Sequence, residues 1–521
     1  MNYADLFRIT LPETALEVAA LLVLVVDLGL LRKAALGVRT TTASVLGVLG
    51  CGAALGLMQG QGSLSFAADG TPYTLLLVTG GYTAVAQIAI LALTAATLLL
   101  LVDTSFTRHA GEFVAVVLMS ATGGLLISGA QDLLVIFTGL ELLSLGLYIL
   151  TAFAKSSGSS AEAALKYYLF GGMSAAFLLF GFSYLYGLTG STNLQKVVFG
   201  SYMLSTSDAW PLWTVAAVMV AAGLGFKVAA VPFHLWAPDA YEGAPAPAAA
   251  FIASVSKIAS FALLISIGTA SLHVGDWFHA MHPHAVGHVE IHEMTGPVAV
   301  PMGFPGPWFM ILAILSAASM LVGNLAALAQ ISVRRLLAYS AIAHAGYIIL
   351  ALAYFSRSPQ SANAVLYYIL TYGLTTIGVF GVIGVVERAT GSDRLDAFLG
   401  LHKRSPLLAV VLLVLFLSLA GIPPLVGFWA KFNLFAAVLR VSAGVVPFTL
   451  VALAVGMSAV SLYYYLQVLK RAYVMPAADT TPIRVHPVTA FVLIAIAAAV
   501  VVLGCFPGLL QDWIASYSRA F

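Results

Sequence analysis

Long apolar runs are the feature that most constrains how this chain can fold. A helix needs about 20 mostly apolar residues to cross a bilayer, and such runs recur along all 521 residues. They lie near 11–31, 43–58, 80–102, 112–129, 132–153, 165–187, 212–235, 247–271, 307–328, 334–354, 364–386, 406–439, 447–474 and 487–507. The runs are continuous and lack the two-residue alternation of a membrane barrel. The sequence therefore predicts an all-α polytopic membrane protein with about 14 transmembrane helices.

Composition excludes two other classes of protein. Hydrophobic residues make up 61% of the chain and charged residues 8%, whereas about 25% of residues are charged in soluble proteins. So few charges cannot cover a soluble fold. A net charge of +2 without a basic run also argues against nucleic-acid binding. The two cysteines, Cys51 and Cys505, lie far apart in apolar runs, and we expect neither a disulfide framework nor a metal pair between them.

Basic residues are distributed unevenly between the two sets of loops. Fifteen Lys and Arg residues follow odd-numbered spans, and five lie on the opposite side with the termini. Because basic loops are retained in the cytoplasm, this bias predicts that both termini are extracytoplasmic. The remaining three basic residues, Lys227, Lys257 and Lys431, lie inside the seventh, eighth and twelfth spans.

These lysines, and Glu141 in the fifth span, are costly to place in lipid. Each costs roughly 2.5–3.5 kcal/mol near the bilayer centre. They could form an ion pair that holds helices together, or a chain of protonatable groups along a transport path. Burial favours a neutral lysine and a nearby carboxylate favours a charged one, so a lysine can switch protonation where an arginine cannot. Three lysines for one glutamate favour the transport interpretation.

Two of the lysine-bearing spans also contain helix breakers. Pro232 follows Lys227, and Pro423 and Pro424 precede Lys431. Irregular backbone at membrane depth is tolerated where it lines a wet cavity or is buried in protein. Because the two spans are five apart in order, they predict two inverted five-helix repeats, each with a Pro-broken helix. Two unrelated proline kinks are the alternative.

Several long motifs resemble a known family. They are GLELLSLGLY, KYYLFGGMSAAFLLFGFSYLYGLTG, GFKVAAVPFHLWAPDAYEGAPAPAAAFIASVSK, GNLAALAQISVRRLLAYSAIAHAGY and SLAGIPPLVGFWAKF. Over nearly the whole chain, the sequence resembles the antiporter-like membrane subunits of bacterial respiratory complex I, the proton-translocating NADH:quinone oxidoreductase. The resemblance implies 14 helices and two inverted five-helix repeats, each with a broken helix.

The resemblance also implies roles for particular residues. Glu141 and Lys227 match the Glu–Lys pair of the family, and Lys257 matches its central lysine. Lys431 matches the charged residue of the second broken helix, and His344 matches the histidine between the two half-channels. We expect these five residues to form a proton relay, in which His344 can accept and donate a proton at once.

Other polar residues are secondary candidates. His234, beside the first break, could take up protons or make a structural hydrogen bond. Asp239 and Glu242 could feed protons inward or cap the next helix. Asp27, which lies near Arg32, and Asp132 are expected to be charges at helix ends.

Sequence features also separate types within the family. One sister type carries a long C-terminal lateral helix, whereas this chain ends at Phe521, soon after its last span. Another usually has a glutamate where this chain has Lys431, so we expect the remaining type. A cation (sodium)/proton antiporter subunit, which shares the Lys and Pro layout, is the alternative function. A purely structural membrane subunit is a third.

The chain carries no Rossmann glycine motif, no CxxC cluster and no paired haem ligands. We therefore expect no cofactor and no metal in this chain, and electron transfer in partner subunits. The resemblance implies that FMN, iron–sulfur clusters and quinone are bound there. It also implies neighbouring antiporter-like and small membrane subunits as partners, in a bacterial cell membrane.

The expected segments follow from the spans. They are an N-terminal three-helix segment (1–110), a first repeat (111–272), an extracytoplasmic loop (273–306), a second repeat (307–475) and a C-terminal helix with its tail (476–521). The loop departs from the family pattern because it holds six of the eleven histidines. Metal binding is one explanation, but a solvated loop particular to this lineage is favoured, since no cysteine and no tight HxxxH pair on an expected helix supports a metal site.

Overall fold

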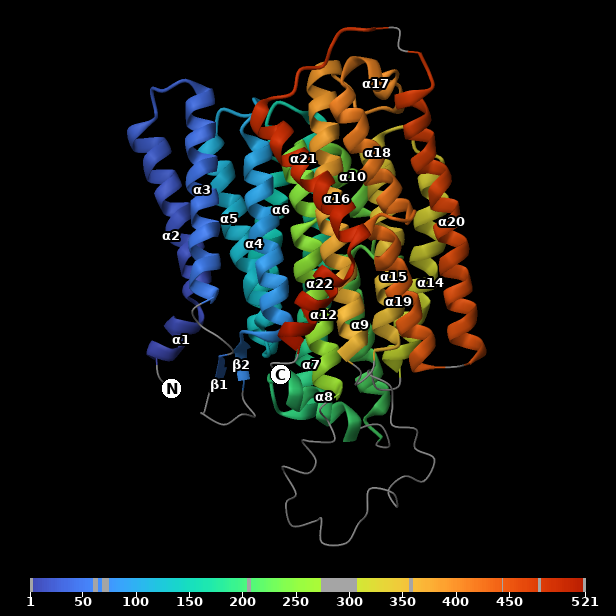
Figure 1. Ribbon diagram of the computed structural model, residues 1–521. Coiled ribbons are helices and arrows are strands. Elements are labelled where there is room, and N and C mark those ends of the chain that lie inside the picture. The colour runs from blue at the N-terminus through green and yellow to red at the C-terminus, as the bar shows by residue number, and fades with distance from the viewer. Residues whose placement is uncertain are drawn as a thin grey trace.

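The computed structural model describes residues 3–59, 64–67, 75–203, 208–272, 307–355, 359–442, 444–476 and 479–518. It is a bundle of roughly parallel and antiparallel helices (Figure 1). One end, the hairpin end, carries the antiparallel strands β1 (Ser65–Ala67) and β2 (Leu75–Val78). The other end, the α17 end, carries α17 (Leu401–Arg404). The short hairpin is a small exception to the all-α prediction.

The helices fall into groups along the chain. The first group is α1 (Tyr3–Ile9), α2 (Leu11–Val25), the π-helix η1 (Val26–Leu30), α3 (Leu36–Gln59) and α4 (Gly81–Leu101). The second is α5 (Ala110–Gly129), α6 (Leu133–Thr151), α7 (Gly158–Thr189), α8 (Leu194–Met203), α9 (Trp210–Val228), α10 (Trp236–Gly243), α11 (Ala246–Ala253) and α12 (Val255–Leu272). The third is α14 (Pro307–Leu328), α15 (Val333–Ala353), α16 (Pro359–Thr390), the 3-10 helix η3 (Leu395–Phe398), α17, α18 (Pro406–Ala420), α19 (Val426–Val441) and α20 (Val445–Tyr473). The last is α21 (Pro487–Cys505) and α22 (Gly508–Ser518).

The described helices account for the predicted spans. Twelve are long and apolar enough to cross a membrane. The two other predicted spans take irregular forms, because the first is α2 continued by η1 and the twelfth is divided into α18 and α19. With these two included, the prediction of about 14 transmembrane helices is confirmed.

Two spans differ in detail from the prediction. The seventh, predicted as 212–235, is helical only to Val228, and helix resumes at Trp236 after a non-helical segment. The eighth is divided at Ser254 into α11 and α12. Hydropathy did not reveal the second division, because small apolar residues continue through it.

Close helix packing repeats itself in the two halves of the chain. A Cβ on Gly123 of α5 would lie 2.5 Å from the Leu143 backbone nitrogen of α6, and a Cβ on Gly323 of α14 would lie 2.6 Å from the Ala343 backbone nitrogen of α15. Glycine lets each helix pair approach at these points. The pairs α5–α6 and α14–α15 therefore pack in the same way.

Backbone bridges at the next helix junctions also match. Leu133 donates its N–H to the Thr192 carbonyl at 2.8 Å, and Val333 donates its N–H to the Asp393 carbonyl at 3.0 Å. The long helices that these bridges follow, α7 and α16, each have 32 residues. Each is followed by a left-handed glycine, with φ 68° and 72° respectively.

The matched helices run in opposite directions. The residues after α7 contact the hairpin, since Asn193 donates to the Leu75 carbonyl at 2.9 Å. Those after α16 lead through η3 to α17 at the opposite end (Figure 1). Together with the paired glycines and bridges, this confirms two inverted repeats. The segment boundaries at 110, 272 and 475 stay predictions, and the histidine-rich loop lies outside the described residues.

Candidate functional site

The first break ends α9 with two local hydrogen bonds. Ala230 donates its N–H to the Gly225 carbonyl at 2.8 Å and Ala229 donates to the Phe226 carbonyl at 3.0 Å, around a left-handed Ala229 with φ 57°. This is the Schellman pattern that stops a helix. It leaves the Val228 carbonyl free to accept another donor.

That donor is Lys257. Its ammonium, on α12, donates to the Val228 carbonyl, and the residue is 3% exposed. The C-terminal carbonyls of a helix carry partial negative charge. The broken helix α9 therefore stabilises a buried positive charge on Lys257 without a carboxylate.

The second break repeats this arrangement. Gly421, left-handed with φ 88°, donates to the Ser418 carbonyl at 2.9 Å, and Ile422 donates to the Leu417 carbonyl at 3.0 Å. The free carbonyl of Ala420 accepts a hydrogen bond from Lys431 Nζ at 2.9 Å. Each repeat thus places one buried lysine on the C-terminus of a broken helix.

Lys431 has two further contacts. Its Nζ donates to Ser458 Oγ on α20 at 2.9 Å and lies 5.6 Å from the centre of the Tyr347 ring. A cation over an aromatic face contributes about 0.5–2 kcal/mol. These contacts hold the ammonium in place at the level of the break. They also give the charge polar partners in a residue that is only 6% exposed.

The predicted Glu141–Lys227 pair is present but loose. Lys227 Nζ lies 3.9 Å from Glu141 Oε1, and it donates its hydrogen bond to Ser144 Oγ on the same helix as Glu141. Glu141 Oε1 has no hydrogen-bond partner in the described part of the chain. Since a buried charge pair is strong only when its geometry is good, this pair is poorly suited to holding helices together.

His344 lies between two tyrosines in the second repeat. Tyr368 Oη is 2.7 Å from Nδ1, and Tyr465 Oη is 3.3 Å from Nε2. A neutral imidazole donates from one nitrogen and accepts at the other. One tyrosine therefore accepts from the ring while the other donates to it, which is the arrangement a proton relay needs.

Further polar groups lie between His344 and Lys431. Asn324 on α14 donates to Tyr347 Oη at 3.1 Å and accepts from Tyr464 Oη at 3.1 Å. The ring of Tyr464 is 4.6 Å from that of Tyr465, centre to centre. Sequence reasoning missed these residues. The consecutive tyrosines at 367–368 and 463–465, inside apolar runs, were the signal that could have revealed this cluster.

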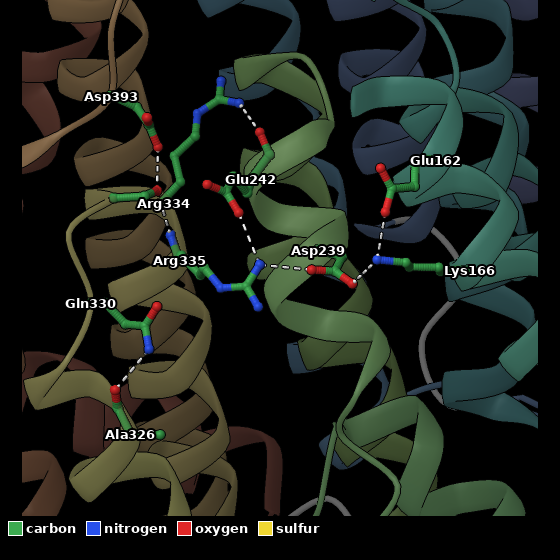
Figure 2. A network of polar contacts seen from close by, with 10 residues as sticks. Glu162, Lys166, Asp239, Glu242, Ala326, Gln330, Arg334, Arg335 and Asp393 are labelled. Atoms are coloured by element: carbon green, nitrogen blue, oxygen red, sulfur yellow. Dashed lines mark hydrogen bonds and ion pairs between the residues drawn. The ribbon is translucent and has the colours of Figure 1, made fainter. Parts of the chain in front are cut away.

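The secondary candidates Asp239 and Glu242 belong to a network of ion pairs that joins the two repeats (Figure 2). Arg335 of α15 contacts Asp239 at 2.7 Å and Glu242 at 2.9 Å, both on α10. Lys166 of α7 contacts Asp239 at 2.9 Å. Burial opposes ionisation of Asp239, but the hydrogen bonds from Lys166 and Arg335 outweigh it and lower the pKa of this carboxyl.

The interpretation of Asp239 and Glu242 as helix caps is wrong. Helix α11 begins after Pro245 without a side-chain cap. The side chains of both residues accept hydrogen bonds from the guanidinium of Arg335 instead of from backbone N–H groups at the start of a helix. The neighbouring Arg334 binds the Glu242 carbonyl at 2.9 Å and so fixes the end of α10 as well.

Three further expectations can be compared with the structure. His234 is 9% exposed, and its Nδ1 has no partner among the described residues. Asp132 does cap α6, since its Oδ1 accepts from the Leu134 N–H at 2.9 Å. Asp27 lies in the first turn of η1 and pairs with Arg39, through two hydrogen bonds of 2.7 and 2.6 Å. Arg39 reaches Asp27 because α3 packs back along α2.

Within the described ranges, no three or more His, Cys, Asp or Glu side chains are grouped so that they could hold a metal ion. The six histidines of the loop lie outside those ranges.

Comparisons with known proteins place this site in context. The family model described as "NADH:quinone oxidoreductase/Mrp antiporter, TM" matches residues 130–282 and 278–458. NADH-quinone oxidoreductase subunit N 2 of Acidobacterium capsulatum is 47% identical, over 99% of each chain. NADH-quinone oxidoreductase subunit N 1 of Roseiflexus castenholzii is 40% identical, over 86% of this chain and 81% of the relative.

Solved structures show the same likeness. A chain of respiratory complex I from Thermus thermophilus is 33% identical and superimposes with a TM-score of 0.74, over 96% of this chain and 98% of the other. A chain of the Mrp complex from Dietzia is 22% identical, with a TM-score of 0.76 over 97% of each chain. The latter similarity shows a shared fold.

Proposed function

Because the chain belongs to the NADH:quinone oxidoreductase/Mrp antiporter family of membrane subunits, we propose that it is the proton-translocating subunit N of a bacterial NADH:quinone oxidoreductase. The paired arrangement at the helix breaks carries this proposal. Each repeat holds one buried lysine on the free carbonyl of a broken helix. A charge held by a carbonyl rather than by a carboxylate can be lost and regained without leaving an unpaired buried anion.

The proposed path runs through the primary candidates in order. Protons enter from the cytoplasm near Lys227 and pass to Lys257. They then cross through His344, its tyrosine partners and bound water to Lys431, and leave on the outer side. The helices that carry Lys257 and His344, α12 and α15, pack against each other. His234, Asp239 and Glu242 lie near the entrance, where the ion-pair network surrounds the second half of the broken helix.

Glu141 has a separate role in this proposal. It is a quarter exposed and lies on the face of α6 that also exposes Leu134, Leu145 and Ile149. Such a face is covered by lipid or by a neighbouring membrane subunit. A charge that moves in that neighbour would change the field at Glu141, and through it the protonation of Lys227 at 3.9 Å.

The same assignment bears on where electron transfer takes place and on how this chain is oriented in the membrane. NADH oxidation and quinone reduction occur in partner subunits, which bind FMN, iron–sulfur clusters and quinone. This chain needs no cofactor, since it moves protons only. The distribution of basic residues supports a bacterial cell membrane location with both termini, and the hairpin end, on the extracytoplasmic side.

A cation/proton antiporter subunit is not favoured as the function. The relatives that match most of this chain at 47% and 40% identity are both subunit N proteins, whereas the Mrp chain shares only 22% of its residues. The sequence alone could not separate the two, because both use the same lysines and prolines.

Affinity purification in mild detergent tests the assignment. We expect this chain to bring down a large complex that reduces quinone with NADH, and deletion of the chain to abolish proton pumping by that complex. Artificial-acceptor reduction by NADH serves as the control for intact redox subunits. Recovery of small membrane subunits without redox activity would contradict the assignment and favour the antiporter.

A further inference from the structure

Helices α2 and α3 form one edge of the bundle (Figure 1). One side of α2 packs against α3 and α5. Its other side is open, since Leu21 is 63% exposed and Val25 is 65% exposed. An exposed apolar face of this kind is suited to lipid or to another membrane protein. Its apolar side chains alone fit either of the two.

Glu17 departs from this apolar pattern, because it is an exposed carboxylate inside a membrane span. Helix α2 and η1 together run from Leu11 to Leu30. At 1.5 Å per residue they cover about 30 Å, which is the thickness of the hydrocarbon core. Glu17 lies about 9 Å from the hairpin end of this span. Long lysine and arginine side chains reach the interface from such a depth, whereas glutamate is shorter.

A second carboxylate lies one helical turn from Glu17. Glu13 is 7% exposed, and its Oε2 has no hydrogen-bond partner among the described residues. Side chains four residues apart are neighbours on a helix, and the charges of Glu13 and Glu17 repel each other. Neither carboxylate forms an ion pair with a described residue. We call Glu13, Glu17 and Leu21 the acidic face of α2.

The opposite end of the same span shows how this chain neutralises a carboxylate of its own. Asp27, in η1, is 1% exposed and forms an ion pair with Arg39 of α3 at 2.6 Å. The neighbouring helix thus supplies a cation at the α17 end. Among the described residues, no such cation is supplied to Glu13 and Glu17 toward the hairpin end. The acidic face therefore lacks a partner that the rest of the span has.

Charge decides between the surfaces that could cover the acidic face. Lipid tails offer the carboxylates neither a cation nor a hydrogen-bond donor. A second copy of this chain, related by a two-fold axis, would place the acidic face against itself, where like charges repel. A transmembrane helix with a lysine or arginine is complementary, because charges inside a membrane pair with one another. Such partners are at hand, since the similar Thermus thermophilus chain is part of respiratory complex I.

We infer that the acidic face of α2 binds a transmembrane helix of a partner membrane subunit, and that this helix presents a lysine or arginine to Glu17. The cation neutralises Glu17, and its remaining N–H donors satisfy Oε2 of Glu13. Leu21 packs along the same helix, one turn further into the membrane. The inference goes beyond the proposed function, because it requires assembly with a membrane subunit but no proton transfer.

Photo-cross-linking in the whole purified complex identifies the occupant. A benzoylphenylalanine photoprobe replaces Leu21, and a control probe replaces Val455, which is 53% exposed on α20 at the opposite edge of the bundle (Figure 1). Mass spectrometry maps the adducts. We expect the probe at position 21 to join this chain to a transmembrane segment of another subunit that contains a lysine or arginine, and the control probe not to reach that segment. Adducts only with lipid, with a second copy of this chain, or with a segment without a basic residue would overturn the inference.

Charge reversal tests the complementarity. Glu17→Lys should lower the yield of the adduct from position 21 by roughly tenfold or more, because two like charges then meet inside the membrane. Replacing the basic residue of the mapped segment by glutamate in the same complex should restore the yield. The control Glu162→Lys reverses a charge whose side chain is 66% exposed on α7, and it should leave the yield unchanged. An undiminished yield in Glu17→Lys, or a loss that the second charge reversal does not rescue, would overturn the inference.

A milder variant decides the matter if the Glu17→Lys complex does not assemble. Glu17→Gln keeps the shape of the side chain and removes only its charge, and it should lower the yield by roughly threefold or more. A yield equal to that of the unchanged chain would overturn the inference. Failure of the proposed function is distinguishable, since it would appear as a purified complex without NADH:quinone activity, whereas the adducts are measured without any redox or pumping assay.

Discussion

At the scale of single residues, the hydrogen bonds of His344 matter more than its depth in the membrane. Both ring nitrogens lie near tyrosine hydroxyls, from Tyr368 on α16 and Tyr465 on α20. A side chain that merely filled space would not need two such partners. The imidazole therefore connects helices of the second repeat through groups that can reverse their direction of donation.

Removing one of these partners should slow pumping. Tyr368→Phe takes away the hydroxyl at Nδ1, and the loss of one hydrogen bond, about 1 kcal/mol, corresponds to a rate reduction of roughly fivefold. The measurement is proton pumping by reconstituted complex. The control is Tyr372→Phe, because that ring lies 4.9 Å from the imidazole, centre to centre, and packs against it. Equal losses in both variants would show that the hydroxyl at Nδ1 has no specific role, since each substitution removes one hydroxyl and keeps its ring in place.

At the scale of elements, the two breaks use the same Schellman pattern with different residues. Gly421 adopts a left-handed conformation at little cost, whereas Ala229 pays about 1–2 kcal/mol for it. A Cβ at position 421 would also lie 3.0 Å from Lys431 Cδ. Gly421 therefore has two roles: it allows the left-handed backbone conformation, and it leaves room for the Lys431 side chain.

Substitutions at the two breaks should change the free energy of unfolding in opposite directions. Gly421→Ala should lower the free energy of unfolding by about 1–2 kcal/mol, and Ala229→Gly should leave it unchanged or raise it. The control Ala230→Gly lies one residue away, outside the left-handed region, and should lower it by roughly 0.5–1 kcal/mol. Thermal inactivation of the purified complex ranks the variants. If the Gly421→Ala complex were at least as stable as the Ala229→Gly complex, this description of the breaks would be refuted.

The elements also show what the sequence can reveal. Prolines and lysines inside apolar runs mark both breaks, because such residues are rare at membrane depth. The partners of those lysines were not predictable. Whether Lys227 meets Ser144 or Glu141, and whether Lys257 reaches the Val228 carbonyl, depends on how neighbouring helices are rotated. No local pattern encodes that rotation.

At the scale of the whole molecule, Arg335 joins the two repeats. It pairs with Asp239 and Glu242, 96 and 93 residues away in sequence, a separation that hid these contacts from sequence reasoning. All three side chains are partly exposed. Water and salt therefore weaken each pair to about 1 kcal/mol or less.

Arg335→Gln should make the complex less heat-stable, and more so at low than at high salt, because mobile ions screen exposed charges. The loss should not exceed about 2 kcal/mol. Arg394→Gln, at the same end, is the control, since Arg394 forms no ion pair within the described part of the chain. The melting temperature of the complex in detergent gives the answer. Equal losses in the two variants would argue against a specific junction.

The central claim is that buried lysines change protonation as protons cross the membrane. Proton pumping per NADH oxidised, in vesicles carrying Lys257→Ala or Lys257→Arg, tests it most directly. We expect both variants to assemble and both to lose pumping by roughly tenfold or more, because alanine carries no proton and arginine does not release one. Pumping that survives in Lys257→Arg would show that a fixed charge suffices, and pumping that survives in Lys257→Ala would remove Lys257 from the path.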